Sequence, residues 1–597
     1  MVKITNYIDP NKTAPSKEVF SLPFVITCFV LVLIPTSILA SYVLLDKHFE
    51  LISFTNIPHY TLNTVLAALH IQSNGPCWTD WYSSLNNDEC YIIISCIAMS
   101  LFLGSFLGYY AGCWAYNKTK SSAERKISGS DLLEFSKAEK SINEALQDDI
   151  KRSGEGLPLH KNIRCSKQLE TRSILICGQI GSGKTQLMLP MIQDAIRRKA
   201  KSFIFDIKGD MSATFRQEGV EVLAPWDKNG LIWAISKDVV DHHSAILFAS
   251  ALIPKNDKDP MWSTSSRIIL AGCCEYLIKK HGQNWGWQSL AEMLDLPDKY
   301  LHRELAMVSK QAANLVIPNS KTSQSMLLTL YGFASPIFDL ATAWGNAETG
   351  VSMKKWINDE NSFPTLIVQS NPNFETLSDA IANLSLEFLS KELLSMPDSS
   401  SREIMFFLDE AALLNFDIGK FLITSRSKGG RIVLGIQSLD LLTKRFTRDE
   451  VNALSSMIGT LIVLRQGGLG NAANDLSNAL GEQQIERLST SFDKDGKSTF
   501  SWQRTTLPVV SKSDLVNLPQ ASKKNGITGY LTILGIPIVA KLNWQLTILP
   551  KRGEPFELAD WLYKDNAKVS INRPKSTVEK ELDKAFEEVD FEEVDDA

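Results

Sequence analysis

The chain has 597 residues, which is too many for a single hydrophobic core and implies several domains. Hydrophobic residues make up 44% and charged residues 22% of the sequence, a balance that excludes both a disordered chain and a transporter built from many apolar spans. The formal net charge is -5, and the acidic residues 587–597 account for its sign, because the rest of the chain is weakly positive. The nine cysteines include no CxxC pair, which argues against a structural zinc site.

Residues 1–130 are predicted to form a membrane anchor. Two uncharged apolar stretches, 24–45 and 91–116, are each long enough to cross about 30 Å of hydrocarbon. A buried core helix is the alternative for both, and a cleaved signal peptide is a further alternative for the first. Basic residues lie before the first stretch and after the second, while the loop 46–90 has one lysine, so both termini are expected in the cytoplasm. A charged segment at about 118–152 is then predicted to be a helical linker.

The loop between the two stretches contains Cys77 and Cys90. In an oxidising outer compartment this pair would form a disulfide, and two free thiols are the alternative. In the second stretch Gly104, Gly108 and Gly112 recur every fourth residue, a small-residue stripe that permits close helix contact. The same spacing is also common by chance.

A phosphate-binding loop follows a β-rich run at 172–177 and precedes a helical pattern that ends at Arg198. Its sequence is Gly178-Gln-Ile-Gly181-Ser182-Gly183-Lys184-Thr185. In this strand–loop–helix context the glycines let backbone N–H groups surround a phosphate, Lys184 contacts the β and γ oxygens, and Thr185 is a ligand of Mg²⁺. The loop therefore predicts ATP and Mg²⁺ as cofactors.

The acidic side of the same site is predicted about 225 residues later. Residues 403–408 form an apolar run typical of a buried parallel strand, and Asp409 and Glu410 follow it. Asp409 is expected to hold the magnesium ion through water, and Glu410 is expected to orient the attacking water as the catalytic base. The alternative is a buried strand that happens to end in two carboxylates.

Further short strands are predicted at 202–206, 364–369, 431–436 and 460–465, each followed by polar residues and a helical pattern. This alternation is typical of one doubly wound α/β sheet, in which ligands bind at the carboxyl ends of the strands. Four side chains are therefore expected near the nucleotide: Asp206, Lys208, Asp210 and Gln437. Gln437 would sense the γ-phosphate; the alternative for these residues is that they cap helices.

Between residues 237 and 350 helical patterns replace the strands, notably at 261–280, 298–313 and 321–343. We expect an all-α insertion domain there, within an α/β nucleotide-binding domain formed by 131–236 and 351–555. The insertion also carries basic and aromatic residues that would line a nucleic-acid path or, equally, a solvated helical surface. These are Trp262, Arg267, Lys279, Lys280, Arg303, Lys310 and Lys321.

The ordered set of motifs resembles the type IV coupling proteins of bacterial conjugation, the TraD and TrwB kind, within the wider group of FtsK- and HerA-like pumps. The resemblance covers about residues 20–550. Besides the two apolar stretches, the phosphate loop and a late β stretch at 529–544, the matching motifs are Asp-Ile-Lys-Gly-Asp at 206–210, Asp259-Pro-Met-Trp262, Phe407-Leu-Asp-Glu-Ala411, Ser425-Arg426-Ser-Lys-Gly-Gly-Arg431 and Gly435-Ile-Gln-Ser438.

The resemblance implies a homohexameric, RecA-like motor in the bacterial inner membrane that links the relaxosome, and so its DNA, to a type IV secretion channel. In such rings an arginine of the neighbouring subunit contacts the nucleotide. Arg426 matches this position, and Arg431 is the second candidate. The helical insertion does not align closely enough to assign residues that contact DNA.

Two other functions compete with a conjugative coupling ATPase. One is a secretion receptor that delivers effector proteins. Its ATPase activity would be stimulated by a secreted protein rather than by DNA. The other is a membrane scaffold whose nucleotide only gates assembly, and the presence of both Glu410 and Arg426 argues against it.

The segment 556–597 is predicted to be an acidic, flexible tail. It ends in a repeat, Phe586-Glu-Glu-Val-Asp590 followed by Phe591-Glu-Glu-Val-Asp595. Dense like charge does not pack on a folded body, so a solubilising end is one interpretation. The repeated Phe and Val favour a second interpretation, in which the tail docks on relaxosome proteins, as the tails of the resembling family do.

Overall fold

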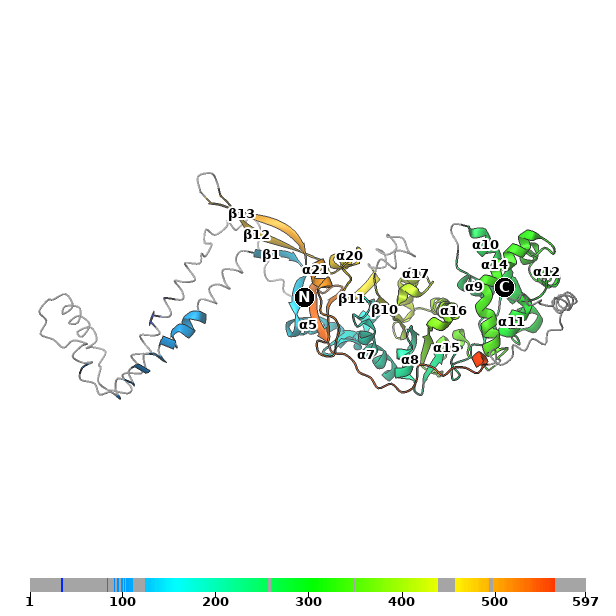
Figure 1. Cartoon of the computed structure of the whole chain (residues 1–597), viewed down its shortest axis with the longest axis horizontal. Coiled ribbons are helices and arrows are strands. Elements are labelled where there is room, and N and C mark those ends of the chain that lie inside the picture. The colour runs from blue at the N-terminus through cyan, green and yellow to red at the C-terminus, as the bar shows by residue number, and fades with distance from the viewer. Residues whose placement is uncertain are drawn as a thin grey trace, which may run out of the picture. The chain divides into compact units, whose positions relative to one another are not determined.

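The computed structural model describes residues 124–255, 259–347, 349–438, 457–492 and 498–563, together with scattered helical residues between 30 and 110. Most of the first predicted span, nearly half of the second, Cys77, Cys90 and the tail beyond 563 lie outside the described residues. The chain divides into two compact units, which are described separately (Figure 1).

The smaller unit contains a three-stranded sheet in the order β1-β12-β13. Its strands are β1 (Glu124–Gly129), β12 (Glu482–Phe492) and β13 (Ser498–Pro508). The Arg125 guanidinium lies 4.6 Å from the ring centre of Trp502, a cation–π contact between β1 and β13. The predicted helix at 118–152 is therefore wrong in its first part. The reason is that β1 pairs antiparallel with β12, a partner about 350 residues away that local propensity cannot reveal.

The larger unit is built on a ten-stranded sheet in the order β2-β15-β14-β11-β5-β10-β9-β6-β8-β7. From β11 to β7 neighbouring strands are parallel, whereas β14 is antiparallel to β11 and to β15. The strands are β2 (Asp131–Glu134), β15 (Ile538–Trp544), β14 (Ile527–Ile533), β11 (Ile458–Val463), β5 (Ser173–Cys177), β10 (Gly430–Ile436), β9 (Ile404–Leu408), β6 (Lys201–Asp206), β8 (Thr365–Gln369) and β7 (Val220–Leu223).

The central strands are continuous apolar runs because helices cover both faces of the sheet. Every residue of β5, β8 and β9 is buried. The predicted α/β class and the positions of its strands are confirmed. The main helices around the sheet are α5 (Phe135–Ser153), α7 (Lys184–Arg197), α8 (Asp210–Phe215), α16 (Glu375–Ser395), α17 (Ile418–Ser425), α20 (Ala472–Ala479) and α21 (Lys512–Val516).

The described residues between β7 and β8 form helices and one short 3-10 turn, as expected for the insertion. The helices are α9 (His242–Leu252), α10 (Pro260–His281), α11 (Trp287–Leu294), α12 (Asp298–Ala306), α13 (Lys310–Leu315), α14 (Lys321–Trp344) and α15 (Met353–Asn358). The single helix predicted at 298–313 is two helices, because the Ser309 side chain accepts a hydrogen bond from Ala312 N and starts a new helix. Of the described helices, α14 has the length and hydropathy of a membrane span, and it packs on α10 and α11.

A buried carboxylate joins the helical insertion to the sheet where the chain crosses between them. Asp238 accepts hydrogen bonds from Trp233 Nε1 at 2.7 Å, Ser352 Oγ at 2.6 Å and Met353 N at 2.8 Å. The Trp233 ring contacts Trp287 of α11, at 6.0 Å between ring centres. Asp238 thus joins the entry and the exit of the insertion, where Ala234 N also donates to the Val351 carbonyl at 3.0 Å.

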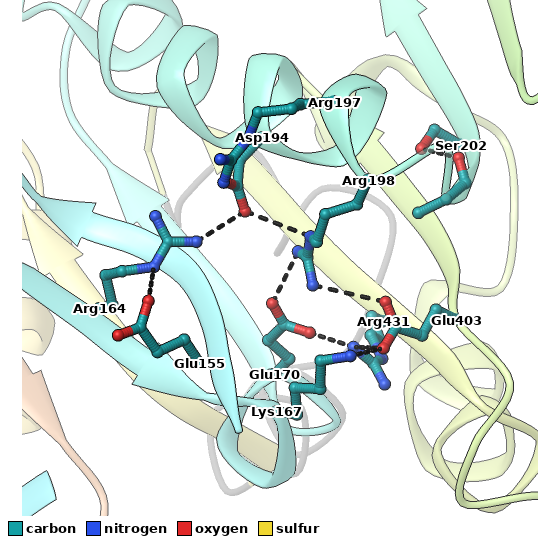
Figure 2. Close-up of polar contacts among 11 residues, drawn as sticks. Glu155, Arg164, Lys167, Glu170, Asp194, Arg197, Arg198, Ser202, Glu403 and Arg431 are labelled. Atoms are coloured by element: carbon teal, nitrogen blue, oxygen red, sulfur yellow. Dashed lines mark hydrogen bonds and ion pairs between the residues drawn. The ribbon is translucent and has the colours of Figure 1, made fainter. Parts of the chain in front are cut away.

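An ion-pair network lies at the amino ends of β9 and β10, where α7 also ends (Figure 2). Its centre is Glu170, whose side chain is fully buried. One Glu170 oxygen accepts from Arg198 at 2.9 Å and the other accepts from Arg431. Arg198 also pairs with Asp194 of α7 at 3.2 Å, and Glu403 completes the network at 3.4 Å from both arginines. The network fixes the carboxyl end of α7 against the sheet.

Replacing Glu170 by Gln should lower the free energy of unfolding by about 3 kcal/mol, because two buried guanidinium groups lose their carboxylate. Urea denaturation of the detergent-solubilised protein measures this loss. Arg152→Gln is the control, since that side chain is 73% exposed and its ion pair is with its helix neighbour Asp149. Equal effects of the two substitutions would contradict the central role of Glu170.

Candidate functional site

The loop between β5 and α7 has the shape that a phosphate-binding loop requires. Gly181 and Gly183 have φ angles of +76° and +99°, in the region where side chains are strained. A Cβ atom on Gly183 would also lie 2.5 Å from the Ile527 side chain, so only glycine fits there. The buried hydroxyl of Ser182 has no hydrogen-bond partner within the described part of the chain. Gly181 and Gly183 of this loop line a cavity.

Lys184 is the first residue of α7 and reaches back across the loop. Its Nζ donates to the carbonyl oxygen of Gly178 at 2.8 Å and lies 3.8 Å from a carboxylate oxygen of Glu410. Burial lowers the pKa of the Lys184 ammonium, while Glu410 and Asp409 act in the opposite direction. The ammonium therefore sits in a dry site with few partners, where a phosphate oxygen would be a favourable one.

Thr185 and Asp409 come together as the sequence predicts. The Thr185 hydroxyl donates to the two Asp409 carboxylate oxygens at 2.9 and 3.1 Å, across 224 residues of chain. Glu410, the next residue, accepts a hydrogen bond from the backbone N–H of Gln437 at 3.1 Å. Burial raises the pKa of both carboxyl groups above their usual range. Two carboxylates are therefore held beside the lysine and the threonine.

These groups line one cavity of about 570 Å³, within the range of small-molecule sites. Gln437 also lines it, at the carboxyl end of β10. Its remaining lining comes from the end of β6, from residues before β14 and from the chain after β15. These residues include Ile207, Lys208, Asp210, Ala521, Lys523, Leu546, Thr547, Ile548, Leu549 and Lys551.

Of the three charged residues predicted at 206–210, Lys208 and Asp210 line the cavity, and Asp206 does not. Asp206 is buried and accepts hydrogen bonds from Gly209 N at 3.0 Å and Ser212 N at 2.7 Å. Asp206 therefore stabilises the turn into α8, as the helix-capping alternative predicts.

The two candidate arginines lie near the amino end of β10, whereas the cavity lies at the carboxyl ends of the strands. The length of β10, about 20 Å, separates Arg426 from the cavity of its own chain. Arg431 is buried in the ion-pair network with Glu170 and is not available to a ligand. Arg426 is exposed and has no ion-pair partner among the described residues.

The residues of the cavity fit a magnesium nucleotide. The glycine loop and Lys184 suit phosphate oxygens, and the Thr185 hydroxyl beside Asp409 supplies the oxygen ligands that Mg²⁺ prefers. Lys523 and the chain after β15 carried no sequence motif, and no local signal could have placed them at this site.

Four basic residues of the insertion make local contacts. Lys279 and Arg267 donate to the backbone carbonyls of Met307 and Ile253, both at 2.9 Å. Lys280 binds the Tyr276 hydroxyl and Arg303 pairs with its neighbour Glu304. All four contacts lie within the insertion itself.

Comparisons with known proteins agree with this geometry. Residues 159–543 match a family model described as the type IV secretion-system coupling protein DNA-binding domain. No curated protein matches the sequence.

Solved structures of the bacterial conjugative coupling protein TrwB share the fold. The unbound form is 20% identical, covers 73% of this chain and 96% of its own, and gives a TM-score of 0.62. TrwB in complex with ADP and Mg²⁺ is 20% identical and covers 73% and 98%, with a TM-score of 0.61. TrwB with a non-hydrolysable ATP analogue is 19% identical with the same coverage and a TM-score of 0.60. The fold is thus that of a nucleotide-binding P-loop protein.

The geometry predicts different defects for two substitutions in the site. Lys184→Ala should abolish ATP hydrolysis, because it removes the ammonium that faces the phosphates. Glu410→Gln should still bind ATP and hydrolyse it at least about a hundredfold more slowly, since the carboxylate expected to act as the base is lost while the hydrogen bond from Gln437 N is kept. Nucleotide titration and phosphate release measure the two steps; equal loss of ATP binding in both variants would contradict the role of Glu410.

Proposed function

Because this chain belongs to the family of type IV secretion-system coupling proteins, we propose that it is the ATP-driven coupling protein of a conjugative DNA-transfer system. It recruits the relaxosome and its DNA to the secretion channel and powers translocation. The observation that carries the proposal is the joining of the phosphate loop to Asp409 and Glu410 inside the matched region. A motor that hydrolyses ATP needs both sides of this site, whereas a scaffold does not.

In the proposed reaction, bound Mg²⁺ would neutralise charge on the phosphates. Side chains of the protein carry out the other steps. Thr185 and Asp409 hold the oxygen ligands in place, and Lys184 offsets negative charge. Glu410 orients a water and accepts its proton, for which its raised pKa is suited. Gln437 donates its backbone N–H to Glu410 and lines the cavity where a γ-phosphate would lie.

The position of Arg426 supports action between subunits. It is exposed at the edge of the sheet opposite to its own cavity, so it would reach a nucleotide only in a neighbouring subunit. A homohexameric ring, as the family resemblance implies, would place one arginine at each interface.

A membrane anchor at the N-terminus is part of the proposal, with two spans in the bacterial inner membrane and both termini in the cytoplasm. The described residues of the second stretch are helical, and Phe102, Phe106 and Tyr109 are 73%, 54% and 63% exposed. Gly104 and Gly108 are buried on the same short helix. Large exposed apolar side chains around a buried small-residue stripe fit a helix that faces lipid.

Deleting the gene in a donor cell with an intact channel should abolish transfer of the element, and the wild-type chain should restore it while Lys184→Ala should not. Counting transconjugants measures this. Normal transfer by the deletion strain would overturn the proposed function.

Arg426→Ala should lack ATPase activity alone and regain part of it when mixed with Lys184→Ala. In the mixed ring some interfaces combine an intact loop from one chain with an intact Arg426 from the other. The mixing ratio should be varied with ring assembly verified. No recovery at any ratio would mean that the arginine acts within its own subunit or lies elsewhere.

The acidic tail is proposed to dock on relaxosome proteins, with its charge speeding the encounter and its aromatic residues inserting into apolar pockets. Removing residues 585–597 should leave the ATPase intact and strongly lower transfer. Changing Phe586 and Phe591 to Ala, with every carboxylate kept, should reproduce most of that loss. If the double variant transfers normally, the tail only aids solubility.

A further inference from the structure

The exposed side chain of Arg426 is carried on a tight turn between α17 and β10. The turn is a short 3-10 segment, Arg426–Lys428. Gly429 closes it with a φ angle of +86°, and Gly429 N donates to the Arg426 carbonyl at 3.3 Å. Among the described residues the Arg426 guanidinium makes no hydrogen bond or ion pair. The position of the turn therefore decides where this guanidinium can reach.

The turn is held by the loop 397–402, here called the support loop, which joins α16 to β9. One guanidinium nitrogen of Arg402 donates to the Lys428 carbonyl at 2.8 Å and to the Pro397 carbonyl at 2.9 Å. The Arg402 backbone also lies against the turn, because a Cβ atom on Gly429 would be 2.6 Å from the Arg402 carbonyl oxygen. Arg402 thus ties the turn to the support loop through a carbonyl of the kind that a helical end leaves unpaired.

Two further contacts join the support loop to the turn. Ser399 N donates to the Ser427 carbonyl at 2.9 Å, and the Lys428 ammonium pairs with Asp398 at 2.9 Å. Hydrogen bonds from Lys428 and Ser427 lower the pKa of the Asp398 carboxyl below its ordinary value. The Asp398 side chain is 72% exposed, so this ion pair is weak and the bonds to backbone carbonyls matter more.

Both the support loop and the turn are anchored in the sheet immediately beyond these contacts. Glu403 follows the support loop and Arg431 follows the turn, and their side chains lie 3.4 Å apart in the ion-pair network (Figure 2). The support loop is therefore fixed at the start of β9 and the turn at the start of β10. Arg402 bridges the two, whereas Arg426 takes part in none of these contacts.

We propose that Arg402 is a positioning residue for ATP hydrolysis, which holds the turn so that Arg426 meets the nucleotide of the neighbouring subunit. This inference rests on the proposed function and adds to it a residue that acts through Arg426. A turn that is already in place reduces the conformational entropy lost when a long side chain contacts a phosphate. Arg402 lies before the amino end of β9, at the edge of the sheet opposite to its own cavity, so it acts on the neighbour's site.

The first test separates ATP binding from hydrolysis in the full-length, detergent-solubilised protein. Arg402→Ala should lower kcat about tenfold and leave the affinity for Mg²⁺-ATP within about twofold, because the cavity of each subunit is unchanged. Arg402→Lys should keep most of the activity, since an ammonium can donate to the same two carbonyls.

The second test mixes variant chains, with ring assembly verified. Arg402→Ala mixed with Lys184→Ala should hydrolyse ATP faster than Arg402→Ala alone, because the Lys184→Ala chain supplies an intact turn to a neighbour with an intact phosphate loop. Arg402→Ala mixed with Arg426→Ala should show no gain over the mean of the two, since both chains are defective on the same side of the interface. A general loss of stability would not produce this difference between the two mixtures.

Arg152→Ala is the matched control, because it also removes an exposed guanidinium that donates to a backbone carbonyl, that of Asp148 at 3.3 Å. It should leave kcat and ATP affinity unchanged. Normal hydrolysis by Arg402→Ala, a loss of ATP affinity as large as the loss of kcat, or a gain on mixing with Arg426→Ala would overturn the inference alone. Normal hydrolysis by Arg426→Ala would overturn the proposed role of Arg426, and the inference with it.

Discussion

The pairing of buried Glu170 with Arg198 and Arg431 is the contact on which the geometry of the site depends. Arg198 caps the carboxyl end of α7, and Lys184 and Thr185 stand at the other end, about 20 Å away along the helix. Arg431 lies on β10, which carries Gln437 at its opposite end. The network thus holds α7 and β10 at the edge of the sheet remote from the cavity. The ends that carry Lys184 and Gln437 are positioned without using a side chain that would contact the ligand.

The cavity itself is organised by the cost of burying charge. Burial raises the pKa of Asp409 and Glu410 and lowers the pKa of Lys184, so the charged form of each group is less stable here than in water. Their mutual attraction offsets only part of this cost. A polyanionic ligand with its cation would complete the set of partners, which explains why so many imperfectly paired groups persist in one place.

The sequence predicts the central strands and the loop well, because each is a local pattern: a buried apolar run, or glycines before a lysine. It fails where a partner is distant. Residues 124–134 read as a charged helix, yet they form strands whose partners lie near the other end of the chain. Asp206 looks like a ligand group from its position after a strand, and only the fold reveals that Gly209 and Ser212 already use it. Residues 546–551 show no periodicity or motif, so their place in the cavity lining follows from topology alone.

The joint at Asp238 has a mechanical consequence. A carboxylate that binds both chain crossings, beside a tryptophan packed between layers, leaves little freedom for the helical insertion to swing independently. The insertion is therefore expected to move together with the residues around Asp238. Since α14 alone is about 36 Å long, a tilt of roughly 10° at the mount would carry a lever of that length through about 6 Å at its tip. A small change of tilt at this joint would thereby become a much larger displacement at the far end of the insertion.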